Sequence, residues 1–182
     1  MSHGHGHADH GGNKGIALLI SVLALVLAFS ETLGKSAQTA ALAQNIEASN
    51  LWAFFQAKTI RQTVLRTAAE QTVIANSSEN SKKQVEKWRE TAQRYQSEPE
   101  TGEGRDQLAA RAKEAEKKRD KAMAAYHHYE VASAAVQIAI VMASASIITS
   151  MVALVWIAGG LGVLGIIFCV IGFFFPTAVH LF

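Results

Sequence analysis

The N-terminal tail contains four histidines that could bind a divalent transition metal. They are His3, His5, His7 and His10, with Asp9 beside the last of them. Neutral imidazoles and a carboxylate are ligands for copper, nickel or zinc. The pattern H-x-H-x-H-x-x-H matches no closed structural zinc site, and a flexible tail loses conformational freedom when it binds. We expect weak chelation of a divalent transition metal and no other cofactor, with a functional metal site as the alternative.

Catalytic motifs are missing from the sequence. There is no phosphate-binding G-x-x-x-x-G-K-[ST], no G-x-S-x-G, no H-E-x-x-H and no C-x-x-C. The single cysteine, Cys169, lies inside an apolar stretch and cannot form a disulfide within the chain. The sequence therefore predicts a protein that is not an enzyme.

A few ionisable residues stand beside the apolar stretches. Glu31 follows the first stretch and lies four residues from Lys35, with which it can pair, or it can reach lipid headgroups. His127 and His128 precede the second stretch, where amphipathic rings commonly occupy the membrane interface. A pH-sensing role for this histidine pair is the alternative.

The elements that position these residues follow from the distribution of charge. The stretch Gly15–Ser30 and the stretch Val131–Phe182 contain no Asp, Glu, Lys or Arg. A bilayer is crossed by about 20 apolar residues, so the second stretch is long enough for two spans. After a flexible tail at 1–13, we predict membrane helices at 14–34, 131–157 and 158–182, with Gly159 and Gly160 as the break between the last two. An uncleaved anchor is favoured over a signal peptide for the first span.

The insert between the first two spans, residues 35–130, holds most of the charge. All but two of the 17 Lys and Arg and all but two of the 15 Asp and Glu lie within 36–130. This balanced mixture does not produce the field that nucleic-acid binding requires, and we exclude a nucleic-acid partner. We predict a helix capped near Ser49 and Asn50, and Asn76–Ser78 as a break before the next helix. One buried stripe is expected at residues spaced by four and three: Ala53, Ala57, Ile60, Val64, Thr67 and Ile74, with Gln71 as its polar exception.

The segment Ser97–Gly104 has the composition of a turn, with one proline, two glycines and three acids. Beyond it the spacing of four and three continues from Leu108 into the second span, which predicts one long helix. We expect the turn to place this helix beside the one that ends near Gln96. The predicted fold class is all-α: three transmembrane helices, with a water-exposed helical hairpin, an antiparallel coiled coil, between spans one and two.

Small residues recur along the last two spans. Lipid provides no hydrophobic drive for helices to associate, so close backbone approach at small side chains stabilises their contacts. The predicted contact residues are Ala135, Ala139, Ala143, Gly162, Gly165, Cys169 and Gly172. We expect them to mediate self-association, and the alternative is that they only pack the second span on the third.

The cations close to span ends predict the orientation. Six Lys and Arg lie between residues 111 and 121, whereas the opposite side has only Lys14. The positive-inside rule therefore places the insert in the cytoplasm.

Two segments resemble a known family: SETLGKSAQ from Ser30 and EASNLWAFFQAKTIRQT from Glu47. The stretch 17–70 that contains them is similar to an uncharacterised bacterial family, domain of unknown function 4337, and the likeness extends over the whole chain. The resemblance implies a multi-pass protein of the bacterial inner membrane and implies no activity.

Two functions remain from the sequence. The first is a non-enzymatic, homo-oligomeric membrane scaffold that presents a cytoplasmic helical hairpin to itself or to another protein. The second is a channel or ion-handling subunit whose His-rich tail gathers metal, although polar residues that could line a pore are scarce in the spans.

Overall fold

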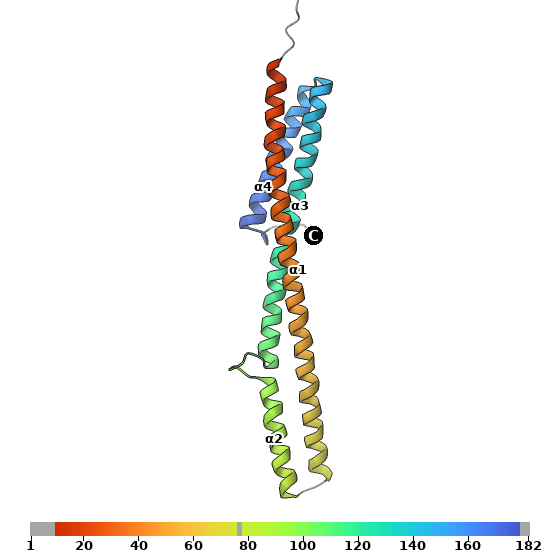
Figure 1. Ribbon diagram of the computed structural model, residues 1–182, viewed down its shortest axis with the longest axis vertical. Helices are drawn as coiled ribbons and strands as arrows, with labels where there is room; N and C mark the ends of the chain where they lie inside the picture. Colours follow the sequence, from red (N-terminus) through yellow and green to blue (C-terminus); the bar gives the residue numbers. More distant parts are fainter. Residues whose placement is uncertain (1–9, 76–77, 179–182) are drawn as a thin grey trace, which may run out of the picture. The chain divides into compact units, whose positions relative to one another are not determined.

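The computed structural model describes residues 10–75 and 78–178, with side chains described from residue 14 onward. This part of the chain is all-α and contains four helices (Figure 1). They are α1 (His10–Ala75), α2 (Glu79–Gln96), α3 (Arg105–Thr149) and α4 (Val152–Phe174). Helix α1 is continuous, so no helix begins at Ser49 or Asn50 and the predicted cap there is wrong. The predicted start of α2 is confirmed: the side chain of Ser78 accepts a hydrogen bond from the Ser81 amide.

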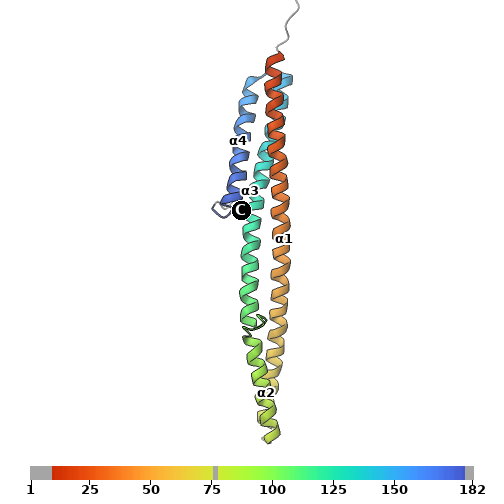
Figure 2. The same ribbon diagram turned by 60° about the vertical axis from the view of Figure 1, so that its left-hand side comes forward.

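The chain divides into two compact units, which are described separately. Unit 1 comprises 1–41 and 120–182 and contains the first part of α1, the last part of α3 and α4. Stretches long and apolar enough to cross a membrane occur in α1, α3 and α4. These three segments lie side by side in unit 1 (Figures 1 and 2). Their shared core is formed by Leu23, Val136, Ala139, Ala143 and Ala158.

The break between α3 and α4 lies at Ser150 and Met151, so the predicted break at Gly159 and Gly160 is wrong. Ser150 has a φ of 55°, in the left-handed region that non-glycine residues rarely adopt, and this conformation ends α3. Both glycines are inside α4, where a helix in an apolar setting tolerates them.

Unit 2 comprises residues 42–119, with the second part of α1, all of α2 and the first part of α3. Helix α2 packs on α1, where the Gln62 amide donates to the Ala92 carbonyl oxygen at 2.9 Å. Helix α3 packs on an earlier part of α1, closer to its N-terminus, where the indole of Trp52 donates a hydrogen bond to Glu116 at 2.9 Å. Within this unit α2 and α3 therefore follow one another along α1 (Figure 1). The prediction that the turn at Ser97–Gly104 sets them side by side is wrong.

The core of unit 2 uses a different face of α1 from the predicted one. The buried residues of α1 in this unit are Ala48, Leu51, Lys58, Gln62 and Ala69. These positions also follow heptad spacing. Two of them, Lys58 and Gln62, are polar, so a pattern of apolar residues alone does not predict this face. The predicted stripe lies two positions away, which is about 200° around a helix, and all of it except the half-buried Ala57 is exposed to solvent.

Candidate functional site

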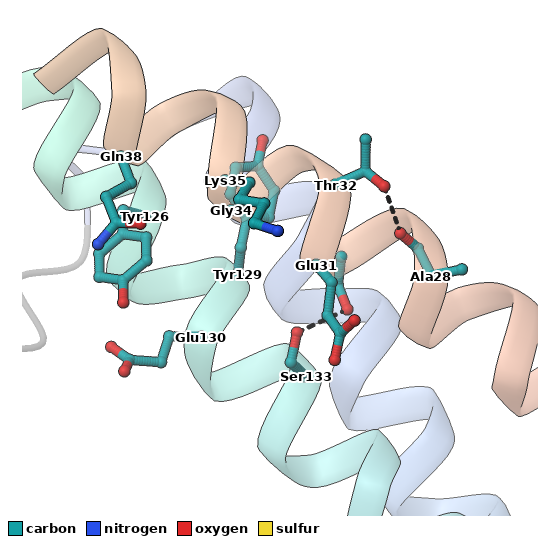
Figure 3. A pocket seen from close by; sticks show the side chains of 11 residues that line it. Ala28, Glu31, Thr32, Gly34, Lys35, Gln38, Tyr126, Tyr129, Glu130 and Ser133 are labelled. Atoms are coloured by element: carbon teal, nitrogen blue, oxygen red, sulfur yellow. Dashed lines mark hydrogen bonds between the residues drawn. The ribbon is translucent and has the colours of Figure 1, made fainter. Parts of the chain in front are cut away.

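A groove of about 460 Å³ opens between α1 and α3 in unit 1 (Figure 3). It lies where the uncharged stretches end, because Glu31 follows the apolar part of α1 and Glu130 precedes that of α3. We call it the interfacial groove. Its polar lining residues include Glu31, Lys35, Tyr126, Glu130 and Ser133. Figure 3 shows Glu31 of α1 beside Ser133 of α3.

The charges of the interfacial groove are of both signs and stay accessible. Glu31 accepts a hydrogen bond from Gln137 at 3.3 Å, and Glu130 lies 3.7 Å from His127. Within the described part of the chain, Lys35 forms no ion pair, so the pairing with Glu31, one of the two possibilities from the sequence, is not present. The groove can therefore offer one ammonium group and two carboxylates to a ligand.

The floor of the groove is closely packed. Ser30 is buried, and its hydroxyl lies 2.9 Å from the hydroxyl of Ser133. Tyr129 is also buried, and its Cβ would lie 3.4 Å from a Cβ added at Gly34. An alanine at position 34 would just touch Tyr129, and a side chain larger than alanine would press on it. These contacts fix the spacing of α1 and α3 beneath the charged residues.

His128 is fully buried next to this floor, whereas its neighbour His127 is half-buried. The Nε2 atom of His128 lies 3.2 Å from the carbonyl oxygen of Pro176, and its ring stacks on Phe168 with centroids 6.1 Å apart. Its Nδ1 atom has no hydrogen-bond partner among the residues that the structure describes. His128 thus joins α3 to the residues that follow α4.

The predicted small residues form contacts within unit 1. A Cβ at Gly162 would lie 2.6 Å from Leu23, and one at Gly165 would lie 2.5 Å from Val136. A Cβ at Gly172 would lie 3.0 Å from His128. The remaining predicted residues are also placed: Ala135, Ala139 and Ala143 are buried, and Cys169 is half-buried. Within the chain, Gly165 and Gly172 pack on α3 and Gly162 packs on α1. Self-association through these residues stays a prediction.

The predicted metal ligands fall largely outside the described residues. His3, His5 and His7 lie there, and His10 is the first residue of α1 with no side chain described. Over the residues that were described, no three His, Cys, Asp or Glu side chains gather as a metal site would require. The weak metal site of the tail stays a prediction.

The exposed stripe of α1 in unit 2 is a second candidate surface, which we call the α1 seam. Its large residues are open to solvent, with Ile60 65%, Val64 61% and Ile74 87% exposed. A shallow groove of about 470 Å³ runs along it and includes Ile60, Val64 and Thr67. The full seam consists of Ala53, Ala57, Ile60, Val64, Thr67, Gln71 and Ile74. A row of apolar residues on the surface of a helix is a candidate site of contact with another molecule.

A buried polar network on the opposite face of α1 was missed by sequence reasoning. Lys58 is only 6% exposed and lies 3.7 Å from Glu98 and 3.8 Å from Glu103. Gln62 accepts a hydrogen bond from Arg105, whose guanidinium lies 4.8 Å from the centroid of the Phe55 ring. The sequence feature that could have predicted this network is the heptad spacing of Lys58 and Gln62 with Leu51 and Ala69. This network ties the segment 97–104 to α1.

Comparison with known proteins identifies a family and adds no function. No curated protein and no solved structure matches the chain. The family model described as domain of unknown function DUF4337 matches residues 12–175, which is most of the sequence. The chain therefore belongs to the DUF4337 family.

Proposed function

We propose that this protein is a non-enzymatic, homo-oligomeric scaffold of the bacterial inner membrane, whose copies associate along the α1 seam. The insert, residues 35–130, is a cytoplasmic helical hairpin with α1 as one arm and α2 followed by α3 as the other. The observation that carries the proposal is the exposure of Ile60, Val64 and Ile74 on a surface with heptad spacing. Single exposed apolar residues are ordinary, but a periodic row is the pattern of a helix that packs on a partner.

A second copy of the chain is the partner that fits this surface. Copies in one bilayer have the same orientation, so their α1 helices run parallel and place the same residues at the same height. Confinement to the membrane also raises the local concentration of one copy around another. The seam of one copy therefore meets the seam of the next, residue against residue.

The residue types of the α1 seam suit parallel pairing. In heptad terms Val64 and Gln71 take position a, while Ile60, Thr67 and Ile74 take position d. Branched side chains fill such a seam, and a single polar residue at position a fixes register and copy number at some loss of stability. Gln71 has this role in the proposal, because a shifted register would set its amide against an apolar residue.

The experiment compares two Val→Glu substitutions on the same helix. Val64 lies in the seam, whereas Val73 is 51% exposed and lies outside it. Light scattering on the detergent-purified protein is expected to give one discrete oligomer that persists on dilution. We expect Val64→Glu to yield monomers and Val73→Glu to retain the oligomer. A wild-type monomer at every concentration, or an intact oligomer with Val64→Glu, would contradict the proposal.

A further inference from the structure

We infer that the interfacial groove binds the headgroup of a phospholipid that carries a primary ammonium group, as phosphatidylethanolamine does. The groove lies at the depth where headgroups reside, because the three apolar segments of unit 1 end together there. Ser30 of α1 contacts Ser133 of α3, and Gly172 near the end of α4 packs on His128. Its volume of about 460 Å³ is in the range of small-molecule sites, roughly 300–1,000 Å³.

The charges of the groove match a zwitterionic headgroup. Lys35 is exposed and forms no ion pair within the described residues, so its ammonium group can meet a phosphate. Glu31 and Glu130 are exposed on the two helices that border the groove, and their oxygens can accept hydrogen bonds from a primary ammonium. Tyr126 adds a hydroxyl donor for a phosphate oxygen.

The same charges disfavour the other common headgroups. An anionic lipid such as phosphatidylglycerol would bring a phosphate near two carboxylates, and Lys35 is the only lysine or arginine in the groove lining to balance them. The quaternary ammonium of phosphatidylcholine has no N–H to donate, and such groups are recognised by cages of several aromatic rings. The groove borders only two tyrosine rings, Tyr126 and Tyr129, and Tyr129 is buried in its floor.

A path for the acyl chains leads away from the groove along α1. Leu18 and Leu25 are 67% and 57% exposed, and they precede Thr32 of the groove at intervals of seven residues. Positions seven apart lie on nearly the same face of a helix. A lipid whose headgroup occupies the groove can therefore lay an acyl chain against these leucines.

The experiment measures lipid retention by native mass spectrometry on the full-length protein in detergent. The protein is mixed with equal amounts of phosphatidylethanolamine, phosphatidylcholine and phosphatidylglycerol. We expect at least about tenfold more phosphatidylethanolamine than phosphatidylglycerol to remain bound, equivalent to about 1.4 kcal/mol. Equal retention of the three lipids would overturn the inference.

Matched variants assign the binding to the groove. We expect the double substitution Glu31→Gln and Glu130→Gln to bring phosphatidylethanolamine binding down to that of phosphatidylcholine, and Lys35→Gln to weaken both. Glu70→Gln, an exposed position of α1 in unit 2, should keep the full preference. An unchanged preference in the double variant, with helical content preserved by circular dichroism, would refute the site.

Soluble ligands separate a lipid site from a site for a small anion. Phosphoethanolamine or inorganic phosphate, added at the lipid concentration, should not displace the lipid, because neither has an acyl chain to lie against α1. Displacement by phosphoethanolamine would assign the groove to a soluble amine, and displacement by inorganic phosphate would remove the role of Glu31 and Glu130. The α1 seam lies in unit 2, so failure here leaves the proposed oligomer untouched.

Discussion

Lys58 illustrates how a charged residue can occupy the core of a helical unit. Its ammonium group lies near the carboxylates of Glu98 and Glu103 and over the rings of Phe54 and Tyr95, at 5.4 and 5.1 Å from their centroids. The carboxylates compensate the loss of hydration, and the rings interact with the cation through their electron-rich faces. Removing one partner from such a group is costly, which favours a single alignment of α1 with the segment 97–104.

The stability of unit 2 should depend on pH through Glu98. The Arg94 guanidinium donates a hydrogen bond to Glu98 at 2.6 Å and lowers the pKa of this carboxyl in the folded state. The group thus contributes stability at pH values above the unfolded pKa of about 4.3. This contribution is lost as the pH falls from there through the lower, folded pKa. Amide hydrogen exchange of 79–104, followed from pH 7 to pH 3, should show the loss.

The controls for this prediction are two conservative substitutions. Glu98→Gln removes the titrating group, so its exchange rates, corrected for intrinsic chemistry, should vary less with acidity than those of the wild type. Glu100→Gln changes an exposed residue of the same segment and should leave the wild-type profile. A profile that is identical for wild type and Glu98→Gln would show that the Arg94 contact contributes nothing.

At the scale of elements, the glycines of α4 fall into two groups. Gly162, Gly165 and Gly172 face α1 or α3, where an added Cβ would overlap or crowd neighbouring side chains. Gly159 and Gly160 have nothing within 4 Å of an added Cβ. Helix α4 therefore packs closely against α1 and α3 on one face and has no close neighbour at Gly159 and Gly160.

Two Gly→Leu substitutions in α4 should differ in their effect on thermal stability. Gly165→Leu forces a side chain against Val136 and the carbonyl oxygen of Ala132, and overpacking of this kind costs roughly 1–3 kcal/mol. Gly160→Leu adds the same side chain in open space. Thermal unfolding in detergent should show a lower midpoint for Gly165→Leu only. Equal midpoints for the two variants would mean that α4 does not pack as described.

The success of sequence reasoning differed between elements for identifiable reasons. Absence of charge located the apolar segments, and small residues located the packed face of α4, because both properties are local. The packed face of α1 was misjudged because the helix carries two heptad series, and the buried one includes Lys58 and Gln62. The break before α4 was misplaced because glycine is compatible with a membrane helix, whereas Ser150 reveals its φ of 55° only in the structure. The interfacial groove combines residues about 100 positions apart, and no local pattern predicts that pairing.

For the molecule as a whole, the proposed membrane topology puts the entire insert on one side of the bilayer. The first span leads into residues 35–130 and the second span leaves them, so the insert and its cations share one compartment. The positive-inside rule makes this compartment the cytoplasm in our proposal.

Labelling with a membrane-impermeant maleimide checks this orientation. Cys169 is half-buried within α4 and should not react in the wild type. A cysteine introduced by Ser81→Cys at the start of α2 should react only after spheroplasts are permeabilised. A cysteine introduced by Thr149→Cys, at the last residue of α3 and on the other side of the bilayer in our proposal, should react before permeabilisation. The reverse order of labelling would invert the proposed orientation.

The short connection at Ser150 and Met151 also has a consequence for biogenesis. From the last residue of α3 to the first of α4, this link reaches at most about 11 Å, whereas the hydrocarbon core is about 30 Å thick. The start of α4 can therefore never be at one surface while the end of α3 is at the other. If α3 and α4 both span the bilayer, as proposed, we expect the two segments to enter it together during synthesis.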